Sequence, residues 1–155
     1  MQPLDLIKTA RLLANAGPGA PTQANLRRAV STAYYALFHA LAKSCADSIT
    51  GSSRGKRGHL AWRQVYRSLE HGVVKNSLAA NGMLAKFPKV IEDFGNHFVT
   101  MQAKRHGADY DPYERFLKSD VINDIDIAES VIVDVKTAPQ KDKKAFCALV
   151  LFKNR

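Results

Sequence analysis

The sequence predicts an all-α protein, an antiparallel up-and-down bundle of about five helices with a short C-terminal extension. Its 155 residues suit one domain, and a composition of 46% hydrophobic and 24% charged residues is typical of globular proteins. Apolar residues recur at helical spacing through most of the chain, and short Gly- or Pro-containing stretches separate the amphipathic segments. We therefore expect a bundle over residues 1–138 and a basic, apolar extension over residues 139–155.

The first half of the chain predicts two helices. Apolar residues from Leu4 to Leu13 indicate a short helix that ends before the Gly-Pro-Gly turn at residues 17–19. Thr22 is a good N-cap for a long second helix over residues 23–48. The core stripe expected for that helix comprises Leu26, Val30, Ala33, Tyr34, Leu37 and Leu41.

The second half predicts three more helices. They are expected over residues 59–70, from Pro88 to near Gly107, and over residues 113–136, with the acidic side chains of the last facing water. Residues 73–86 are ambiguous. Residues 139–155 fit a docked strand, a docked helix or a partner-binding segment.

Charge and composition limit the function classes. A net charge of +9 favours a polyanionic partner such as RNA, and five basic residues cluster early in the chain: Arg54, Lys56, Arg57, Arg63 and Arg67. No apolar run approaches the roughly 20 residues of a membrane span, and the first residues lack a leader pattern. Two cysteines without metal-ligand spacing indicate free thiols in a cytoplasmic protein, for which we predict neither a metal nor a cofactor.

The second helix carries polar groups beside its core stripe. At 100° per residue, Arg28, Thr32, Tyr35, His39 and Lys43 share one narrow stripe. Arginine can bind phosphate through its forked donors, and histidine can carry protons near neutral pH. A solvated helix face with a snorkelling tyrosine explains the same spacing.

The end of the fourth predicted helix is a second candidate region. Arg105 continues an apolar stripe and should point inward, whereas Gly107 should end the helix in a left-handed turn. Asp109 could pair with Arg105 or cap the next helix, and Tyr110 could pack as a core plug. Alternatively, Arg105 and the adjacent His106 act on a phosphate.

These two regions resemble the HEPN family (higher eukaryotes and prokaryotes nucleotide-binding domains). The similarity lies in RRAVSTAYYALFHAL at residues 27–41 and RHGADYD at residues 105–111. His59 also resembles the histidine that opens the third helix in one branch of that family. The resemblance covers about residues 4–136 and implies an all-α, HEPN-like bundle that forms a symmetric dimer.

The resemblance also implies functions. Many family members are metal-independent ribonucleases or toxins, often neutralised by a minimal nucleotidyltransferase. Their active motif is an Arg followed by a His four to six residues after it, whereas Tyr110 stands five residues after Arg105 here. The catalytic residues would then be drawn from Arg105, His106, Tyr110 and His39.

Three functions remain open at this point. In the first, a toxin–antitoxin or defence protein binds RNA and cleaves it without metal. The residues expected to bind RNA or a nucleotide are Arg28, Tyr35, Asp109, Arg54, Lys56, Arg57 and His59. In the second, a non-catalytic module binds a nucleotide or a nucleotidyltransferase partner. In the third, the chain is a helical adaptor.

Overall fold

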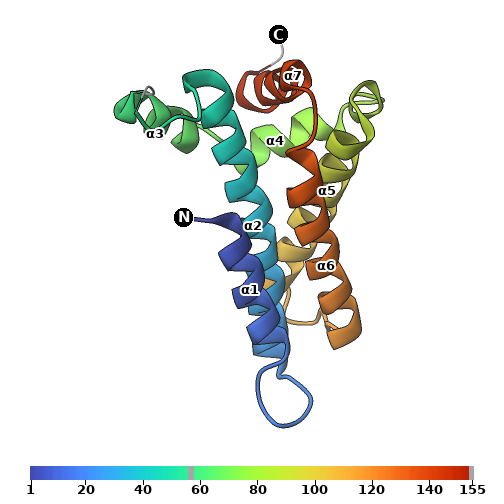
Figure 1. Cartoon of the computed structure of the whole chain (residues 1–155). Coiled ribbons are helices and arrows are strands. Elements are labelled where there is room, and N and C mark those ends of the chain that lie inside the picture. The colour runs from blue at the N-terminus through green and yellow to red at the C-terminus, as the bar shows by residue number, and fades with distance from the viewer. Residues whose placement is uncertain (56–57, 154–155) are drawn as a thin grey trace.

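The computed structural model describes residues 1–55 and 58–153 as an all-helical protein (Figure 1). Seven α-helices and one short 3-10 helix occur in these ranges, instead of about five helices, and the described residues form no strand. The helices are α1 (Pro3–Ala14), α2 (Gln23–Thr50), α3 (His59–Arg67), α4 (His71–Ala79), η1 (Leu84–Lys86), α5 (Lys89–Tyr110), α6 (Lys118–Val135) and α7 (Gln140–Leu151).

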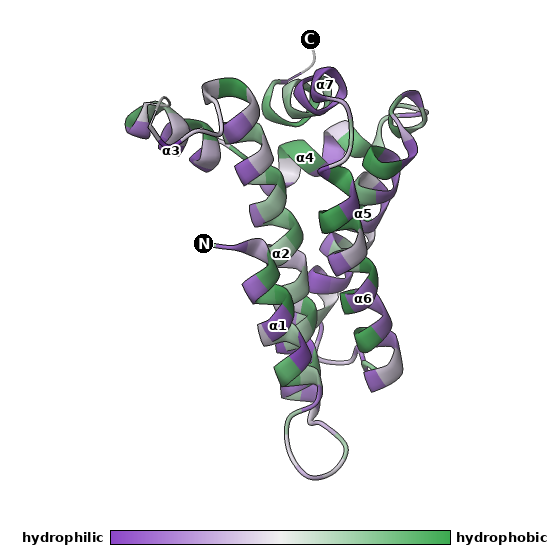
Figure 2. Cartoon of the chain, viewed as in Figure 1, coloured by the Kyte–Doolittle hydropathy of each residue, from purple (hydrophilic) through white to green (hydrophobic). Residues whose placement is uncertain are grey.

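Four long elements form the body of the protein. The helices α1, α2, α5 and α6 run alternately down and up, and α2 packs against the other three (Figure 1). The shorter helices α3, α4 and α7 lie at one end of this bundle. Green and purple residues alternate along the helices in Figure 2, as expected for amphipathic helices that bury one face.

The long helix α2 begins and ends where local chemistry favours it. The Thr22 hydroxyl accepts a hydrogen bond from the backbone N–H of Asn25, which confirms the predicted N-cap. The helix ends at Gly51, whose φ of 95° is a conformation that favours glycine. All six residues of the predicted core stripe are buried: Leu26, Val30, Ala33, Tyr34, Leu37 and Leu41.

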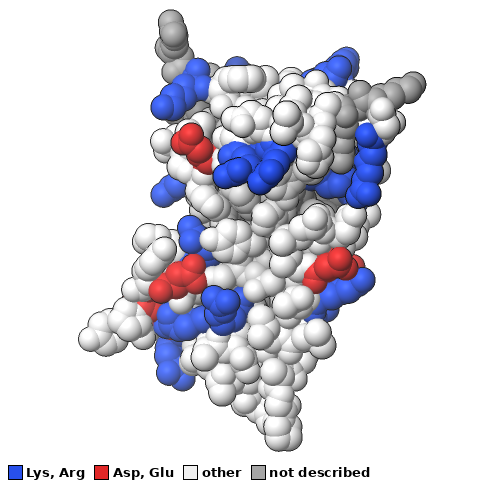
Figure 3. Space-filling view, turned by 90° about the vertical axis from the view of Figure 1, so that its left-hand side faces the viewer, with Lys and Arg blue, Asp and Glu red and all other residues white. Residues whose placement is uncertain are grey.

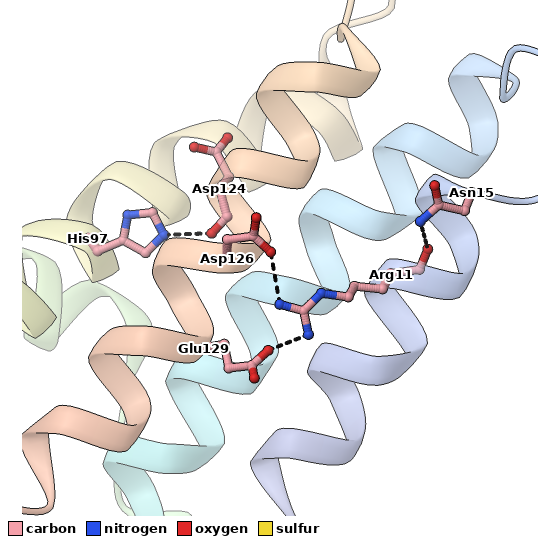
Figure 4. A network of polar contacts seen from close by, with 6 residues as sticks. All are labelled: Arg11, Asn15, His97, Asp124, Asp126 and Glu129. Atoms are coloured by element: carbon pink, nitrogen blue, oxygen red, sulfur yellow. Dashed lines mark hydrogen bonds and ion pairs between the residues drawn. The ribbon is translucent and has the colours of Figure 1, made fainter.

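Charged groups tie α6 to its neighbours (Figure 4). Arg11 of α1 pairs with Asp126 at 2.9 Å and with Glu129. The prediction that the acids of this helix face water is wrong for Asp124, which is 7% exposed. Its carboxylate lies 2.7 Å from Lys104 Nζ, and its carbonyl oxygen lies 3.0 Å from His97 Nε2, because α5 packs along this side of α6.

The C-terminal segment, which the sequence left open, folds as α7 and docks on α2 and α4. Phe146 is 3% exposed and contacts the rings of Phe87 and Phe94. Cys147 is buried against Cys45 of α2, and both thiols are free, in agreement with the sequence. Residues 140–151 therefore belong to the packed body rather than to a free tail.

The helix α5 runs past Gly107 to Tyr110, which corrects the expected left-handed turn there. Gly107 is buried at a close approach instead, where an added Cβ would meet the Glu114 carboxylate. Arg27 of α2 holds this end by donating to the carbonyl oxygens of Ala108, at 2.9 Å, and Glu114. These contacts give Arg27 a structural role between α2 and the loop after α5.

Candidate functional site

The site forms where α5 crosses the middle of α2. Arg105 points inward as predicted, with a side chain that is 15% exposed. Its guanidinium carbon lies 5.2 Å from the ring centroid of Tyr34 and 5.9 Å from that of Tyr35. A guanidinium over aromatic faces gains a cation–π attraction, which strengthens as water is removed.

Asp109 balances the charge of Arg105. Its Oδ2 lies 3.3 Å from Arg105 Nη1, and its Oδ1 accepts a hydrogen bond from the Ser31 hydroxyl of α2. The Asp109 side chain is 27% exposed, so this pair lies at the rim of the core. The predicted pairing of Arg105 with Asp109 is confirmed.

His71 joins the same group from the first position of α4. Its Nδ1 shares a hydrogen bond with the hydroxyl of Tyr34, which is fully buried. The imidazole stacks on Phe38 with ring centroids 4.1 Å apart. Its backbone carbonyl accepts a hydrogen bond from Gln102 Nε2 at 3.0 Å, which ties the start of α4 to α5.

His39 extends the group toward α3. Its Nδ1 lies 2.6 Å from the hydroxyl of Tyr66, and the two rings stack. Tyr35 contacts both imidazoles, with centroid distances of 6.4 Å to His39 and 6.0 Å to His71. We call this set the Arg–His cluster: Ser31, Tyr34, Tyr35, Phe38, His39, Tyr66, His71, Arg105 and Asp109.

The environment of the cluster favours neutral imidazoles. Burial lowers the pKa of His71, and the positive charge of Arg105 lowers it further. Burial also lowers the pKa of His39. Burial raises the pKa of Tyr34, which therefore keeps its hydroxyl proton. Two neutral histidines beside an arginine can accept protons near neutral pH, while the arginine attracts phosphate oxygens.

The structure brings together four of the predicted residues, namely Tyr35, His39, Arg105 and Asp109. His106 is exposed on another side of α5, where its ring contacts Tyr110. Tyr110 is 66% exposed, so its prediction as a core plug is wrong. The reason is that α5 continues as a helix and carries both residues away from α2.

The remaining predicted binding residues lie outside the cluster. Arg28 is exposed on α2, two helical turns before Tyr35. Arg54 is exposed after the end of α2, and His59 is exposed at the start of α3. The predictions for Lys56 and Arg57 fall outside the described residues.

Sequence reasoning missed His71 as a site residue. It lies just before the segment that the sequence left ambiguous, and no spacing relates it to Arg105. Only the tertiary structure reveals it, because α4 crosses the end of the bundle and places the His71 imidazole next to Tyr34.

One face of the molecule is more basic than acidic. Figure 3 shows Lys and Arg side chains at several places on this face, with fewer Asp and Glu. Across residues 1–55 and 58–153, no group of three or more His, Cys, Asp or Glu is arranged to hold a metal ion. In the same ranges, no helix has the length and apolar composition that a membrane crossing requires.

Comparison of the chain with protein-family models, curated proteins and solved structures finds no match.

Proposed function

We propose that this chain is an HEPN-type RNA-binding protein that functions as a dimer in a toxin–antitoxin or defence system. The observation that carries the proposal is the convergence of Arg105, His39 and His71 on the rings of Tyr34 and Tyr35. Groups with perturbed pKa values gather at functional sites more often than elsewhere. The net charge of +9 supports a polyanionic ligand, and the all-α fold is compatible with the family resemblance.

Arg105 is the group that would contact an RNA phosphate. Its carboxylate partner Asp109 is held at 3.3 Å, a long ion pair that a phosphate oxygen could replace or share. Its Nε–H is buried and has no hydrogen-bond acceptor in the described part of the chain. Tyr35 is half-buried beside it and offers a ring on which a base could stack.

RNA binding is tested with a labelled single-stranded RNA whose fluorescence anisotropy is followed against salt. We expect Arg105→Ala to weaken binding about tenfold, the loss typical of one hydrogen bond to a charged group. Arg105→Lys keeps the charge but loses the planar fork and its stacking on Tyr34 and Tyr35, so it should recover only part of the lost affinity. The matched control is Arg115→Ala, an exposed arginine in the loop after α5, which should leave affinity unchanged within about twofold.

Helical content is measured by circular dichroism for each variant, so that a loss of binding is not a loss of fold. An equal loss of affinity in Arg105→Ala and Arg115→Ala would show a diffuse electrostatic surface instead of a site. Absence of binding at low salt would refute the function itself.

A second candidate function, metal-independent RNA cleavage, is favoured by the neutral His71 next to Arg105. In the tautomer that carries its proton on Nδ1, His71 donates to the Tyr34 hydroxyl oxygen, and the lone pair on Nε2 can take the proton of a ribose 2′-hydroxyl. The 2′-oxygen would then attack the adjacent phosphorus and form a 2′,3′-cyclic phosphate. The P–O5′ bond would break, and the departing 5′-oxygen would take a proton from a general acid, while Arg105 stabilised the charge of the transition state.

Cleavage is tested with the same RNA in the presence of EDTA. We expect His71→Ala to lower the cleavage rate about 100-fold or more, as loss of a general base does. The exposed His106 supplies the control, because His106→Ala should cleave at the wild-type rate. Wild-type protein that binds RNA but leaves it intact at micromolar concentration would eliminate this candidate and retain the first.

A further inference from the structure

A second site lies outside the Arg–His cluster, in a cleft of about 770 Å³. The start of α1, the last third of α2 and the turn between α6 and α7 form its walls, and these elements meet in the upper half of Figure 1. This volume is within the range of roughly 300–1,000 Å³ that small-molecule sites occupy.

The cleft carries an excess of positive charge. Four of the described residues that line it are lysines, namely Lys43, Lys136, Lys143 and Lys144, against one carboxylate among them, that of Asp47. That carboxylate already lies 2.9 Å from Lys43 Nζ and accepts a hydrogen bond from Trp62 Nε1 at 2.8 Å. No ion pair joins the other three lysines to a carboxylate of residues 1–55 or 58–153.

The fold holds these like charges together. Lys136 caps α6, and Lys143 reaches back from α7 to donate to the Lys136 carbonyl oxygen at 3.1 Å. Gln140 at the start of α7 contacts the Ser48 hydroxyl of α2 at 3.4 Å. Neighbouring like charges repel, so an arrangement that collects them without counter-charges costs free energy unless an anion is bound.

The rest of the lining suits an organic group. Hydroxyls and apolar side chains alternate around the lysines: Leu4, Ala40, Ser44, Ser48, Ser52, Ile132 and Val135. Lysines bind phosphates as point charges, serine hydroxyls can donate to phosphate oxygens, and the apolar residues offer a surface for a ring.

We propose that this cleft binds a small organic ligand that carries two or more linked phosphates. Three lysines without carboxylate partners in residues 1–55 and 58–153 match the several negative charges of such a group, whereas a single phosphate would leave part of the charge unbalanced. The site does not depend on RNA binding at the Arg–His cluster.

Trp62 is the only tryptophan of the chain and bonds to Asp47 in the cleft wall, so its fluorescence reports on the site. We would titrate the whole protein with adenosine triphosphate, inorganic tripolyphosphate, orthophosphate and adenosine, and repeat each titration by calorimetry. The expected result is saturable binding of adenosine triphosphate, with weaker tripolyphosphate binding and no detectable binding of orthophosphate or adenosine below about 1 mM.

The double variant Lys136→Gln/Lys144→Gln should weaken that binding at least tenfold. Its matched control is Lys75→Gln/Lys118→Gln, which removes the same charge from exposed positions outside the cleft and should change binding less than twofold. Equal effects of both double variants, or no saturable binding of either polyphosphate, would overturn the site. If tripolyphosphate binds as tightly as adenosine triphosphate, the proposal that the cleft also binds the organic part of the ligand is wrong.

RNA affinity separates this site from the proposed function. The double variant Lys136→Gln/Lys144→Gln should bind RNA within about twofold of wild type, whereas Arg105→Ala should not. If RNA affinity falls equally in both, the cleft is part of the RNA path and the small-ligand proposal fails.

Discussion

The Arg–His cluster and the lysine cleft use the same helix in opposite ways. At residues 31–39, α2 supplies side chains whose polar atoms pair with groups from α3, α4 and α5. At residues 40–48, the same helix lines a cleft in which three lysines from the α6–α7 region have no carboxylate partner among the described residues. In the cluster, the polar side chains are packed against the core, whereas Lys136 and Lys144 of the cleft lie at the surface.

Substitutions in the two regions should therefore change the stability of the protein by different amounts. Removing one partner from a half-buried pair leaves the other unsatisfied and destabilises the protein. Removing an exposed lysine costs little stability, usually within about 0.5 kcal/mol. Stability measurements therefore distinguish the two regions even before a ligand is identified.

The largest effect is expected at the core contact that docks α7, the helix that carries two of the cleft lysines. Phe146 is 3% exposed and holds α7 against Phe87 and Phe94, so Phe146→Ala should lower the free energy of unfolding by about 3–5 kcal/mol. Urea denaturation followed by circular dichroism measures this loss. The conservative variant Phe146→Leu should lose less than half as much, and equal losses would argue against a tightly packed site.

A smaller effect is expected inside the cluster. Tyr34→Phe removes a buried hydroxyl that bonds to His71 and should cost about 1–2 kcal/mol. Tyr66→Phe is its matched control, because that hydroxyl also bonds to a histidine but belongs to α3, a helix without a fully buried residue. We expect a loss under about 1 kcal/mol there, and the reverse order would contradict the contrast between core and rim.

The smallest effect is a dependence of stability on pH. Burial lowers the folded-state pKa values of His39, His71 and His97 below the unfolded value of about 6.5. Below about pH 6.5 the unfolded chain takes up protons that the folded protein does not, so the free energy of unfolding should be full above that pH and fall below it. The limiting slope is about 1.4 kcal/mol per pH unit for each histidine.

Urea midpoints between pH 5.0 and 7.5 measure this slope. His71→Asn should flatten it, whereas His106→Asn, at an exposed position, should follow the wild-type curve. The cleft variant Lys136→Gln/Lys144→Gln should also follow that curve, because lysines do not titrate in this range. A slope unchanged in His71→Asn would show that this imidazole is not held neutral by the fold.

Much of the fold could be predicted from local patterns. The N-cap at Thr22 follows from its residue type, because a threonine hydroxyl accepts a hydrogen bond from the first helical turn. The core stripe of α2 and the inward direction of Arg105 follow from spacing, because a helix repeats its faces at a fixed period. The expected end of α5 at Gly107 was wrong, since the glycine allows a close approach of Glu114 instead of a turn. A glycine in the sequence fits either a turn that ends a helix or a close approach of another segment, so its presence does not distinguish between them.

Four of the nine cluster residues could be predicted from the local sequence. Tyr35 and His39 share a helix stripe, and Asp109 follows Arg105 closely enough in the chain for the two to pair. His106 and Tyr110 could not be excluded from spacing, because their positions depend on whether α5 continues. His71, Lys143 and Lys144 become neighbours of α2 only through the crossing of α4 and the docking of α7.

By itself, the sequence determined that the chain is helical, which faces of its long helices are apolar, and that it carries excess positive charge. These properties depend on neighbours within one or two helical turns. The tertiary structure alone decided that His71 meets Tyr34, that Asp124 is buried with Lys104, and that α7 completes a basic cleft. Such contacts join residues far apart in the chain, and packing between helices, rather than periodicity within them, selects which side chains meet.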